Sequence, residues 1–393
     1  MTGKLSKTIS YGRQSISQAD INAVVDVLKS DFLTQGETVI GFENALGKYF
    51  GARHVCAVAN GTAALHLIGI ALGWQAEDFI ICPSLTFVAT ANSIVYSGAT
   101  PEFVDICPAS YTLDPNQVEE RIKKLRSNGK RVVALIGVDY AGHPCDWQSL
   151  RWLADKYDLK LVNDNCHAMG ATYKDNKKYA VEFADAVTQS YHPVKHITTG
   201  EGGAILTNSS DLDAKVKKLR THGITKNPDQ AKIGESWVYK MDELGFNYRI
   251  TDFQSALGNS QLKRLDKFVE RRREIASRYD LELDRLDLIE IPQSTADVSH
   301  SYHLYPLLIE FDQLKCSKTS LFSNLQKKGI ALQVHYIPVH TQPYYRENFS
   351  TEDSSLKNTL QFYEQEVSLP IYPDLDLRSQ ELVLEELMKH VLP

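Results

Sequence analysis

The chain has 393 residues, 43% of them hydrophobic and 23% charged, and its 43 basic and 49 acidic residues give a net charge of −6. These proportions are ordinary for a globular protein. Because no block of basic residues stands out, the composition argues against nucleic acid or an anionic membrane surface as the main partner. The length favours one large domain and a smaller one.

Targeting and redox signals are weak along the chain. The longest uncharged stretch, residues 79–101, contains Pro83 and many polar side chains that lipid would penalise, so we expect no membrane span. The N-terminus lacks the apolar core of a secretion signal, which predicts a cytoplasmic protein. The six cysteines form no C-x-x-C pair, and no His or carboxylate spacing resembles a metal site. We therefore expect reduced thiols and no metal.

Two helices are predicted first. Residues 17–20 (SQAD) form a capping-box pattern. The helix that follows has one apolar face, formed by Ile21, Val24, Val25 and Leu28. A second helix runs through Phe42, Leu46 and Phe50, and Gly51 is its predicted end.

Short β-rich runs then alternate with helical stretches. The runs cover residues 55–59, 79–82, 102–106, 132–137 and 160–162. Such alternation predicts a mostly parallel sheet with helices on both faces. Ligands of these sheets bind at the carboxyl ends of the strands, where loops lead into helices.

A second, smaller domain is predicted after a helix through residues 254–265. A charged helix, residues 267–280, connects to it, and strands are expected at 301–310 and 332–335. We therefore divide the chain into a large domain, residues 1–265 with an N-terminal arm, and a small domain, residues 266–393.

Residues 58–65 (VANGTAAL) predict a strand, a tight turn and the start of a helix. The free N–H groups near Gly61 and the hydroxyl of Thr62 would form an anion site there. A plain helix cap is the alternative. The spacing matches neither a dinucleotide fingerprint nor a P-loop.

Lys195 closes the run 190–195 (SYHPVK), directly before the glycine-rich residues 198–204, and Asp164 follows an earlier predicted strand. Pyridoxal phosphate (PLP) requires such a pair: an amine for the Schiff base and a carboxylate for the pyridine nitrogen. Each residue also has an ordinary interpretation, as a surface lysine and as a helix-capping aspartate. Their combination with the anion site favours a PLP enzyme.

Three further side chains are candidates at this site. His167 could contact the cofactor ring or its phenolic oxygen, or could be a core histidine. Phe87 could stack on the ring, although an aromatic residue at a helix start is more often part of a core. Ser190 is a candidate phosphate ligand.

These motifs, in this order, resemble the DegT/StrS family of PLP-dependent nucleotide-sugar aminotransferases over nearly the whole chain. The matching segments are 33–36, 60–65, 86–92, Asp164 with His167, 190–195, 245–249 and 254–258. The resemblance implies an α/β fold of the aspartate-aminotransferase type (PLP fold type I). Some relatives carry His in place of the lysine and act as dehydratases, whereas this chain has Lys195. Asn163 and Tyr191 also depart from the commoner Glu and Phe.

The resemblance implies a role for each site residue. Lys195 is the catalytic Schiff-base lysine, Asp164 pairs with the pyridine nitrogen and Phe87 stacks on the ring. The phosphate is held by Thr62, Ser190 and Asn247, the last from the partner subunit of a homodimer. Candidates for the sugar-nucleotide pocket are Tyr11, Thr34, His303, Tyr305, His335 and Tyr336.

Segments 11–14, 139–146, 303–306 and 334–345 resemble the branch of the family that serves pseudaminic-acid synthesis. This branch implies glutamate as amino donor and a UDP-linked 4-keto-6-deoxy-2-acetamido sugar as acceptor. A bacillosamine-type or other nucleotide-sugar aminotransferase, a PLP-dependent sugar dehydratase and a non-catalytic sugar-binding relative stay open as alternatives.

Overall fold

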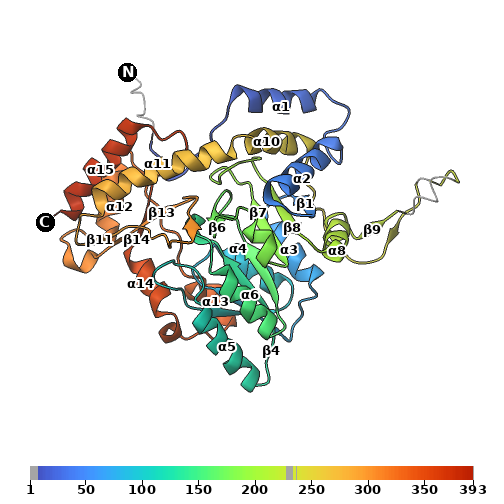
Figure 1. The fold of residues 1–393 in the computed structure, drawn as a ribbon, viewed down its shortest axis with the longest axis horizontal. Helices are drawn as coiled ribbons and strands as arrows, with labels where there is room; N and C mark the ends of the chain where they lie inside the picture. The colour runs from blue at the N-terminus through green and yellow to red at the C-terminus, as the bar shows by residue number, and fades with distance from the viewer. Residues whose placement is uncertain (1–7, 227–232, 236, 393) are drawn as a thin grey trace.

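The computed structural model describes residues 8–226, 233–235 and 237–392 (Figure 1). Its centre is a seven-stranded sheet with the order β1-β8-β7-β5-β4-β2-β3. The strands are β1 (His54–Val58), β2 (Asp78–Pro83), β3 (Thr100–Val104), β4 (Arg131–Val138), β5 (Lys160–Asp164), β7 (Ala186–Ser190) and β8 (Gly203–Thr207). Only β8 runs antiparallel to its neighbours in this sheet. The predicted mostly parallel sheet is confirmed.

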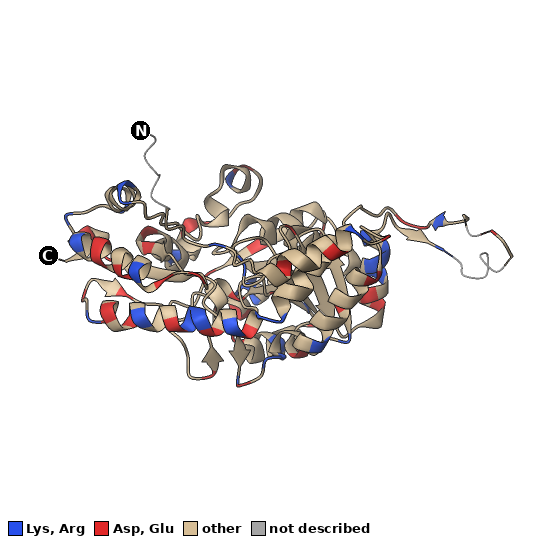
Figure 2. Cartoon of the chain, turned by 90° about the horizontal axis from the view of Figure 1, so that it is seen from above, with Lys and Arg blue, Asp and Glu red and all other residues tan. Residues whose placement is uncertain are grey.

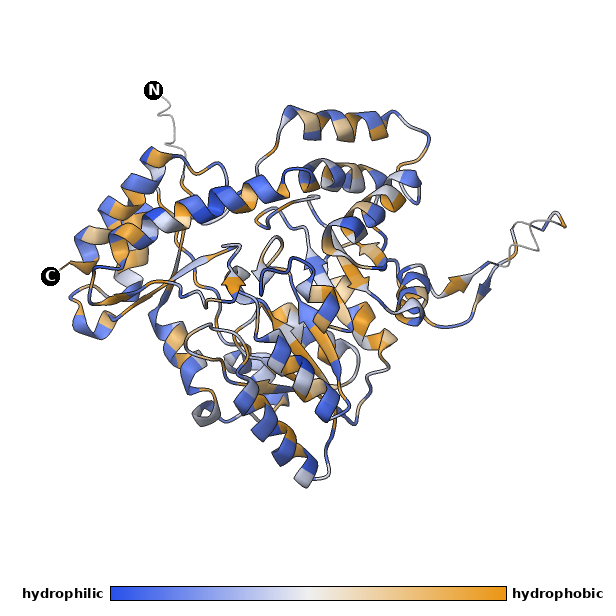
Figure 3. Ribbon diagram, viewed as in Figure 1, coloured by the Kyte–Doolittle hydropathy of each residue, from blue (hydrophilic) through white to orange (hydrophobic). Residues whose placement is uncertain are grey.

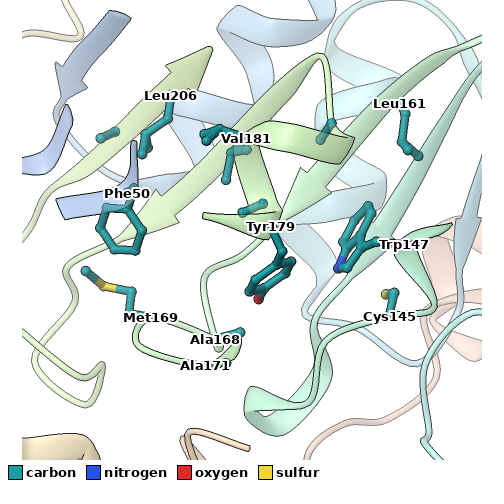
Figure 4. Packing of buried hydrophobic residues seen from close by; sticks show 14 of the residues in the cluster. Phe50, Cys145, Trp147, Leu161, Ala168, Met169, Ala171, Tyr179, Val181 and Leu206 are labelled. Carbon is teal, nitrogen blue, oxygen red and sulfur yellow. The ribbon is translucent and has the colours of Figure 1, made fainter. Parts of the chain in front are cut away.

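Helices cover both faces of this sheet because alternate strand residues point to opposite sides. In β1, Val55 and Ala57 join one hydrophobic core, and Cys56 and Val58 join the other. The first core, part of which Figure 4 shows, packs against α2 (Glu37–Phe50), α5 (Pro115–Ser127), α6 (Trp147–Lys156) and α7 (Tyr179–Phe183). The second packs against α3 (Gly61–Ala71), α4 (Val88–Tyr96) and α8 (Ser210–Arg220). Figure 3 shows the hydrophobic residues gathered on the central strands.

A three-stranded antiparallel sheet organises the C-terminal part. Its order is β11 (Ile289–Glu290), β13 (Tyr305–Ile309), β14 (Glu366–Leu369). The helices around it are α11 (Leu265–Leu283), α12 (Lys318–Lys327), α14 (Lys357–Gln365) and α15 (Leu377–Val391). The helices α11, α12 and α15 share a separate core with Ile9 from the N-terminal arm. α11 begins at the predicted domain boundary and contributes to both cores, with Phe268 in the first and Tyr279 in this one. The division at residue 265 stays a prediction.

The remaining elements are short or peripheral. They are α1 (Gln18–Leu28), η1 (Tyr140–Gly142), β6 (Thr172–Tyr173), β9 (Ile224–Thr225), β10 (Lys240–Met241), α10 (Asp252–Leu262), β12 (Val298–Ser299), η2 (Phe311–Gln313), η3 (Val339–Thr341), α13 (Pro343–Asn348) and η4 (Asp353–Ser355). β9 and β10 form a hairpin that extends away from the body of the molecule (Figure 1).

The first helix starts as predicted, but its apolar face is not covered by the rest of the chain. Ser17 and Asp20 form the capping box. α1 lies along α10 (Figure 1), yet Ile21 is 47% exposed and Leu28 is 55% exposed. The apolar face that the sequence indicates therefore faces outward. The second helix, α2, ends as predicted at Gly51, which adopts a φ of 71° that glycine tolerates.

One predicted strand is wrong. Residues 332–335 form no ladder, and Gln333 makes only an isolated bridge to Ser368. The backbone N–H of His335 donates instead to the carboxyl group of Glu366, at 3.0 Å. A side chain thus takes the hydrogen bond that a neighbouring strand would have supplied.

Acidic and basic residues are mixed along the described helices and strands (Figure 2). Within the described part of the chain, no helix combines the length and hydrophobicity needed to cross a membrane.

Asp105, next to β3, connects the large sheet to the start of α14. Its Oδ1 accepts hydrogen bonds from the backbone N–H and the hydroxyl of Thr359, at 2.8 and 2.7 Å. Its Oδ2 accepts from the N–H of Asn358, also at 2.8 Å. Asp105 and Thr359 are both buried.

Replacement of Asp105 should therefore weaken the fold. We expect Asp105→Ala to lower the free energy of unfolding by about 2–3 kcal/mol, because several buried donors lose their hydrogen-bond acceptor. Asp114→Ala, which removes the half-buried cap of α5 and its hydrogen bond from Gln117, should cost about 1 kcal/mol. Urea unfolding of both variants checks this, and equal losses would contradict the proposed role of Asp105.

Candidate active site

Lys195 lies in the turn that follows β7. Backbone hydrogen bonds from Lys195 N to His192 O (2.9 Å) and from Thr199 N to Tyr191 O (3.0 Å) hold this turn. The ring of Tyr191 is fully buried and packs edge-on against Phe42, with 5.3 Å between centroids. The backbone from which the Lys195 side chain extends is therefore held in place by the hydrophobic core.

The amine of Lys195 is removed from bulk water. Its Nζ lies 3.5 Å from Nε2 of His303. Loss of hydration lowers the pKa of Lys195, although Cys166 and the Asp164 carboxylate oppose this shift. The neutral amine, the form that acts as a nucleophile or base, is thus available at a lower pH than in an exposed lysine.

Asp164 is the last residue of β5, beside β7 in the sheet. Its Oδ2 accepts a hydrogen bond from the hydroxyl of Thr90 at 2.8 Å, and the Thr90 hydroxyl also lies 2.8 Å from that of Thr86. Its Oδ1 accepts from the N–H of Cys166 at 3.3 Å. The carboxylate is 6% exposed and is held by α4 and by its own loop. Parallel strand ends thus bring Asp164 and the Lys195 turn to one edge, as predicted.

The predicted anion site lies where α3 begins. Asn60 caps the helix, and its side chain accepts from the N–H of Ala63 at 2.8 Å. A Cβ on Gly61 would approach Cβ of Ser190 to 3.0 Å, and one on Gly203 would approach the backbone of Asn60 to 2.5 Å. Glycine at both positions lets the helix start meet the end of β7.

This meeting brings together the three predicted phosphate-side residues of this subunit, Gly61, Thr62 and Ser190. The first N–H groups of a helix have no acceptor within the helix and carry a partial positive charge. With the hydroxyls of Thr62 and Ser190, they can bind an anion.

His167 bridges the two parts of the chain. Its Nδ1 accepts a hydrogen bond from the N–H of Ala141 at 3.3 Å, so its Nε2 carries the proton and lies 3.1 Å from the hydroxyl of Tyr336. Its ring lies 4.4 Å from that of His303. Burial lowers the pKa of His167 and of His303 well below the ordinary value, so both stay neutral at neutral pH.

His335 and Tyr11 line the same side. Their ring centroids are 5.1 Å apart. Nδ1 of His335 lies 2.8 Å from the hydroxyl of Ser368. Burial, and to a smaller extent the charge of Lys195, lowers the pKa of His335 to about 3, so this imidazole is also neutral.

Arg272 supports the histidine that contacts Lys195. Its Nη1 donates to the carbonyl oxygens of Tyr302, His303 and Ile371, at 3.0, 3.1 and 2.9 Å. Burial lowers the pKa of this guanidinium to about 9. α11 thereby fixes the backbone on which His303 sits.

Cys166 lies between the Asp164 loop and the anion site. Its Sγ would be 3.5 Å from a Cβ on Gly61. Burial, with a smaller effect of the Asp164 charge, raises the pKa of the Cys166 thiol well above its usual value.

Of the other predicted residues, Phe87 borders this group and the rest lie apart from it. Phe87 precedes α4, is 54% exposed and faces Tyr336 with 5.8 Å between ring centroids. Thr34 and Asn247 are exposed and make isolated backbone bridges to Thr251 and Thr221. Tyr305 is fully buried in the C-terminal core, and its hydroxyl donates to Asp280 at 2.6 Å. The structure thus does not bring Thr34, Asn247 or Tyr305 to Lys195.

Sequence reasoning missed three supporting residues: Thr90, Arg272 and Ser368. A signal existed for Arg272, since it falls on the apolar face of α11 between Phe268 and Ile275, where a charged residue needs an explanation. Thr90 lies inside the recognised segment 86–92, but nothing in that pattern marks it as the partner of Asp164.

The site residues fit pyridoxal phosphate. A buried amine with a lowered pKa, a carboxylate held by neighbouring donors and a helix start shaped by glycine occupy one edge of the sheet. These are the groups needed for an aldehyde, a pyridine nitrogen and a phosphate. Among the described residues, no group of three or more His, Cys, Asp or Glu side chains is placed to hold a metal ion.

Residues 14–388 match the DegT/DnrJ/EryC1/StrS aminotransferase family. The chain belongs to this family. It is 38% identical over 379 residues to the UDP-4-amino-4,6-dideoxy-N-acetyl-beta-L-altrosamine transaminase of Campylobacter jejuni serotype O:23/36, with 96% of each chain covered. The Helicobacter pylori enzyme of the same name is 36% identical over 386 residues, with 98% of each covered.

A solved structure agrees with these relatives. Helicobacter pylori PseC, an aminotransferase involved in the biosynthesis of pseudoaminic acid, superposes with a TM-score of 0.90 and 32% identity, covering 98% of this chain and 99% of that one. The predicted fold of the aspartate-aminotransferase type and the predicted family are confirmed.

The lowered pKa of Lys195 can be measured directly. In cofactor-free protein, we expect acetylation of Lys195 to rise with pH at a midpoint below that of surface lysines, because burial destabilises its ammonium form. Peptide mass spectrometry after brief treatment with acetic anhydride at a series of pH values checks this. A midpoint at or above that of the surface lysines in the same sample would contradict it.

Proposed function

We propose that this PLP-dependent aminotransferase transfers an amino group from glutamate to C4 of a UDP-linked 4-keto-6-deoxy-2-acetamido sugar, in pseudaminic-acid synthesis. The observation that carries the proposal is the grouping of Lys195, Asp164 and the Gly61–Ser190 contact at one sheet edge. The names of relatives that share 36–38% identity over nearly the full length support the choice of sugar.

Pyridoxal phosphate, when bound, supplies an aldehyde that takes up amines and a ring that withdraws electrons from the attached carbon. Lys195 would hold the aldehyde through Nζ and, once displaced by the amino acid, would move a proton at that same atom. Asp164 would face the pyridine nitrogen, with Thr90 fixing its Oδ2. The start of α3 and Ser190 would bind the phosphate and so orient the ring.

The sugar nucleotide would enter beside the neutral imidazoles. His303, His335, Tyr336 and Tyr11 surround this side of the Lys195 amine. Neutral side chains suit a sugar, whose polar groups are hydroxyl, amide and keto groups, because no unpaired charge is buried against them. Tyr305 is left out of this pocket because its hydroxyl is already bonded to Asp280.

The active form is a homodimer with shared sites in this proposal. Large apolar side chains are exposed on α1, on the segment after it and on the β9–β10 hairpin, namely Ile21, Leu28, Phe32, Leu33, Trp237, Tyr239 and Met241. A second copy would cover them. The exposed Asn247 would then reach the phosphate in the partner's site, and Thr34 would approach its sugar pocket. We also propose that the enzyme acts in the cytoplasm.

The PLP chemistry has a direct test. The purified protein should be yellow, and borohydride should fix the cofactor to Lys195, as peptide mapping would reveal. Lys195→Ala should lose the label and stall the reaction with glutamate. Lys195→Arg should do no better, because a guanidinium stays protonated.

The same experiment separates the alternatives. An aminotransferase converts glutamate to 2-oxoglutarate in the absence of sugar, whereas a sugar dehydratase or a non-catalytic relative does not. A label on another residue, or no label, would contradict the role of Lys195.

The sugar can be tested by offering two C5-epimeric keto sugars with glutamate. We expect the L-arabino epimer to be preferred over the D-xylo epimer by roughly tenfold to a hundredfold in kcat/KM, since each unpaired buried polar group costs about 1–3 kcal/mol. Preference for the D-xylo epimer would favour the bacillosamine-type reaction and leave the PLP mechanism intact.

A further inference from the structure

His335 lies outside any strand, and side chains of β14 and Tyr140 hold it in place. Its backbone N–H donates to Oε2 of Glu366 at 3.0 Å, and the hydroxyl of Tyr140 donates to its backbone carbonyl. On the side chain, Nδ1 lies 2.8 Å from Oγ of Ser368, which in turn lies 2.5 Å from Oε1 of Glu366. Glu366 and Ser368 share one face of β14, because they are two residues apart in a strand.

The second ring nitrogen of His335, Nε2, is accessible. Nε2 has no hydrogen-bond partner among the described residues, and it is not one of their buried unpaired atoms, so it remains accessible. The ring centroid lies 5.1 Å from that of Tyr11 and 4.9 Å from that of Tyr336. The charge of Lys195 contributes to the lowered pKa of His335. Nε2 is therefore available to a substrate next to the lysine.

Glu366 is a fully buried carboxyl group without an ion pair. It has 0% exposure, and no described basic group lies within 4 Å of it. Lys318 on α12 is the cation whose charge reaches it, but that ammonium donates to the carbonyl oxygen of Tyr363. Because an unpaired buried carboxylate is costly, the neutral acid is favoured. Burial raises the pKa of Glu366 to about 8.

A neutral acid determines the direction of every hydrogen bond in this chain of groups. Oε2 accepts from the backbone of His335, so the acid proton lies on Oε1 and is donated to Oγ of Ser368. The Ser368 hydroxyl then donates to Nδ1 of His335. A neutral imidazole with an accepting Nδ1 carries its proton on Nε2.

We propose that Glu366, acting through Ser368, holds His335 as the neutral Nε2–H tautomer, which donates a hydrogen bond to an oxygen of the sugar substrate. His335 is then a specificity-determining residue, and Ser368 and Glu366 are its positioning residues. A hydrogen-bond donor at this place binds a keto, amide or hydroxyl oxygen and disfavours an N–H group. This role deepens the proposed function and rests on it.

Above the pKa of Glu366, the directions reverse. The ionised carboxylate accepts from Ser368, the serine accepts from Nδ1–H, and Nε2 becomes an acceptor. The charged or titratable groups that face this chain of groups are Lys318, Lys195, Tyr11, Tyr140 and Tyr336. Burial raises the pKa of the three tyrosines, so none of them ionises before Glu366 as the pH increases.

Glu366→Gln provides a matched control. Its amide oxygen can accept from the His335 N–H and its amide nitrogen can donate to Ser368, so it copies the neutral acid but cannot ionise. Ser368→Ala removes the connection altogether.

The tautomer is read by ¹⁵N NMR of histidine-labelled holoenzyme, with the His335 signals assigned from His335→Gln. At pH 7, wild type and Glu366→Gln should both show a protonated Nε2. At pH 9, wild type should switch to a protonated Nδ1 and Glu366→Gln should not. A protonated Nδ1 in wild type at pH 7, or the same switch in Glu366→Gln, would overturn the role of Glu366.

Kinetics test the role of the tautomer. In Ser368→Ala at pH 7, kcat/KM for the sugar nucleotide should fall about tenfold relative to kcat/KM for the half-reaction with glutamate. The loss should come from a higher KM for the sugar nucleotide. An altered tautomer without this relative loss would overturn the contact between His335 and the sugar. If wild type fails in the glutamate half-reaction, the proposed function is wrong, whereas the NMR result still decides the hydrogen-bond directions.

Discussion

The close meeting of α3 with β7 and β8 is the constraint on which the site depends. Because Gly61 and Gly203 lack a Cβ, the start of a helix can touch the ends of two strands. This contact places the positive end of the helix next to Ser190, one short turn before Lys195. Any side chain at Gly61 would push the helix start away from the end of β7, so one contact sets the position of the helix start relative to the lysine turn.

The C-terminal part supplies the other wall, and its attachment uses buried polar groups. Arg272 of α11 donates to three carbonyl oxygens, two of them in the loop of His303. Asp105 caps α14 from the side of the large sheet. These contacts have strict geometry, unlike apolar packing, which tolerates sliding. They hold the histidines at a defined distance from Lys195.

The strand runs predicted from the sequence correspond to β1, β2, β3, β4 and β5 of the large sheet, whereas β7 and β8 were not among them. Most of the residues at the carboxyl edge were predicted. Strand patterns and glycine turns are local, so they identify Asp164, Gly61 and Lys195 without knowledge of the fold.

Patterns in the C-terminal part of the chain were less informative. The motif around residues 303–306 did not separate His303, which faces the lysine, from Tyr305, which enters the core, because the start of β13 decides which face each takes. The absence of a strand at 332–335 could not be predicted, since it depends on the side chain of Glu366, about thirty residues further along the chain.

The buried thiol of Cys166 has a consequence for chemical selectivity. A thiolate is a strong nucleophile, and one next to an aldehyde-binding site would compete with an amine for the carbonyl carbon. Burial and the Asp164 charge keep this sulfur protonated, whereas burial pushes Lys195 toward its neutral, reactive form. The same loss of hydration thus makes the sulfur unreactive and the nitrogen reactive. The two groups can therefore lie at one site without competing for the carbonyl carbon.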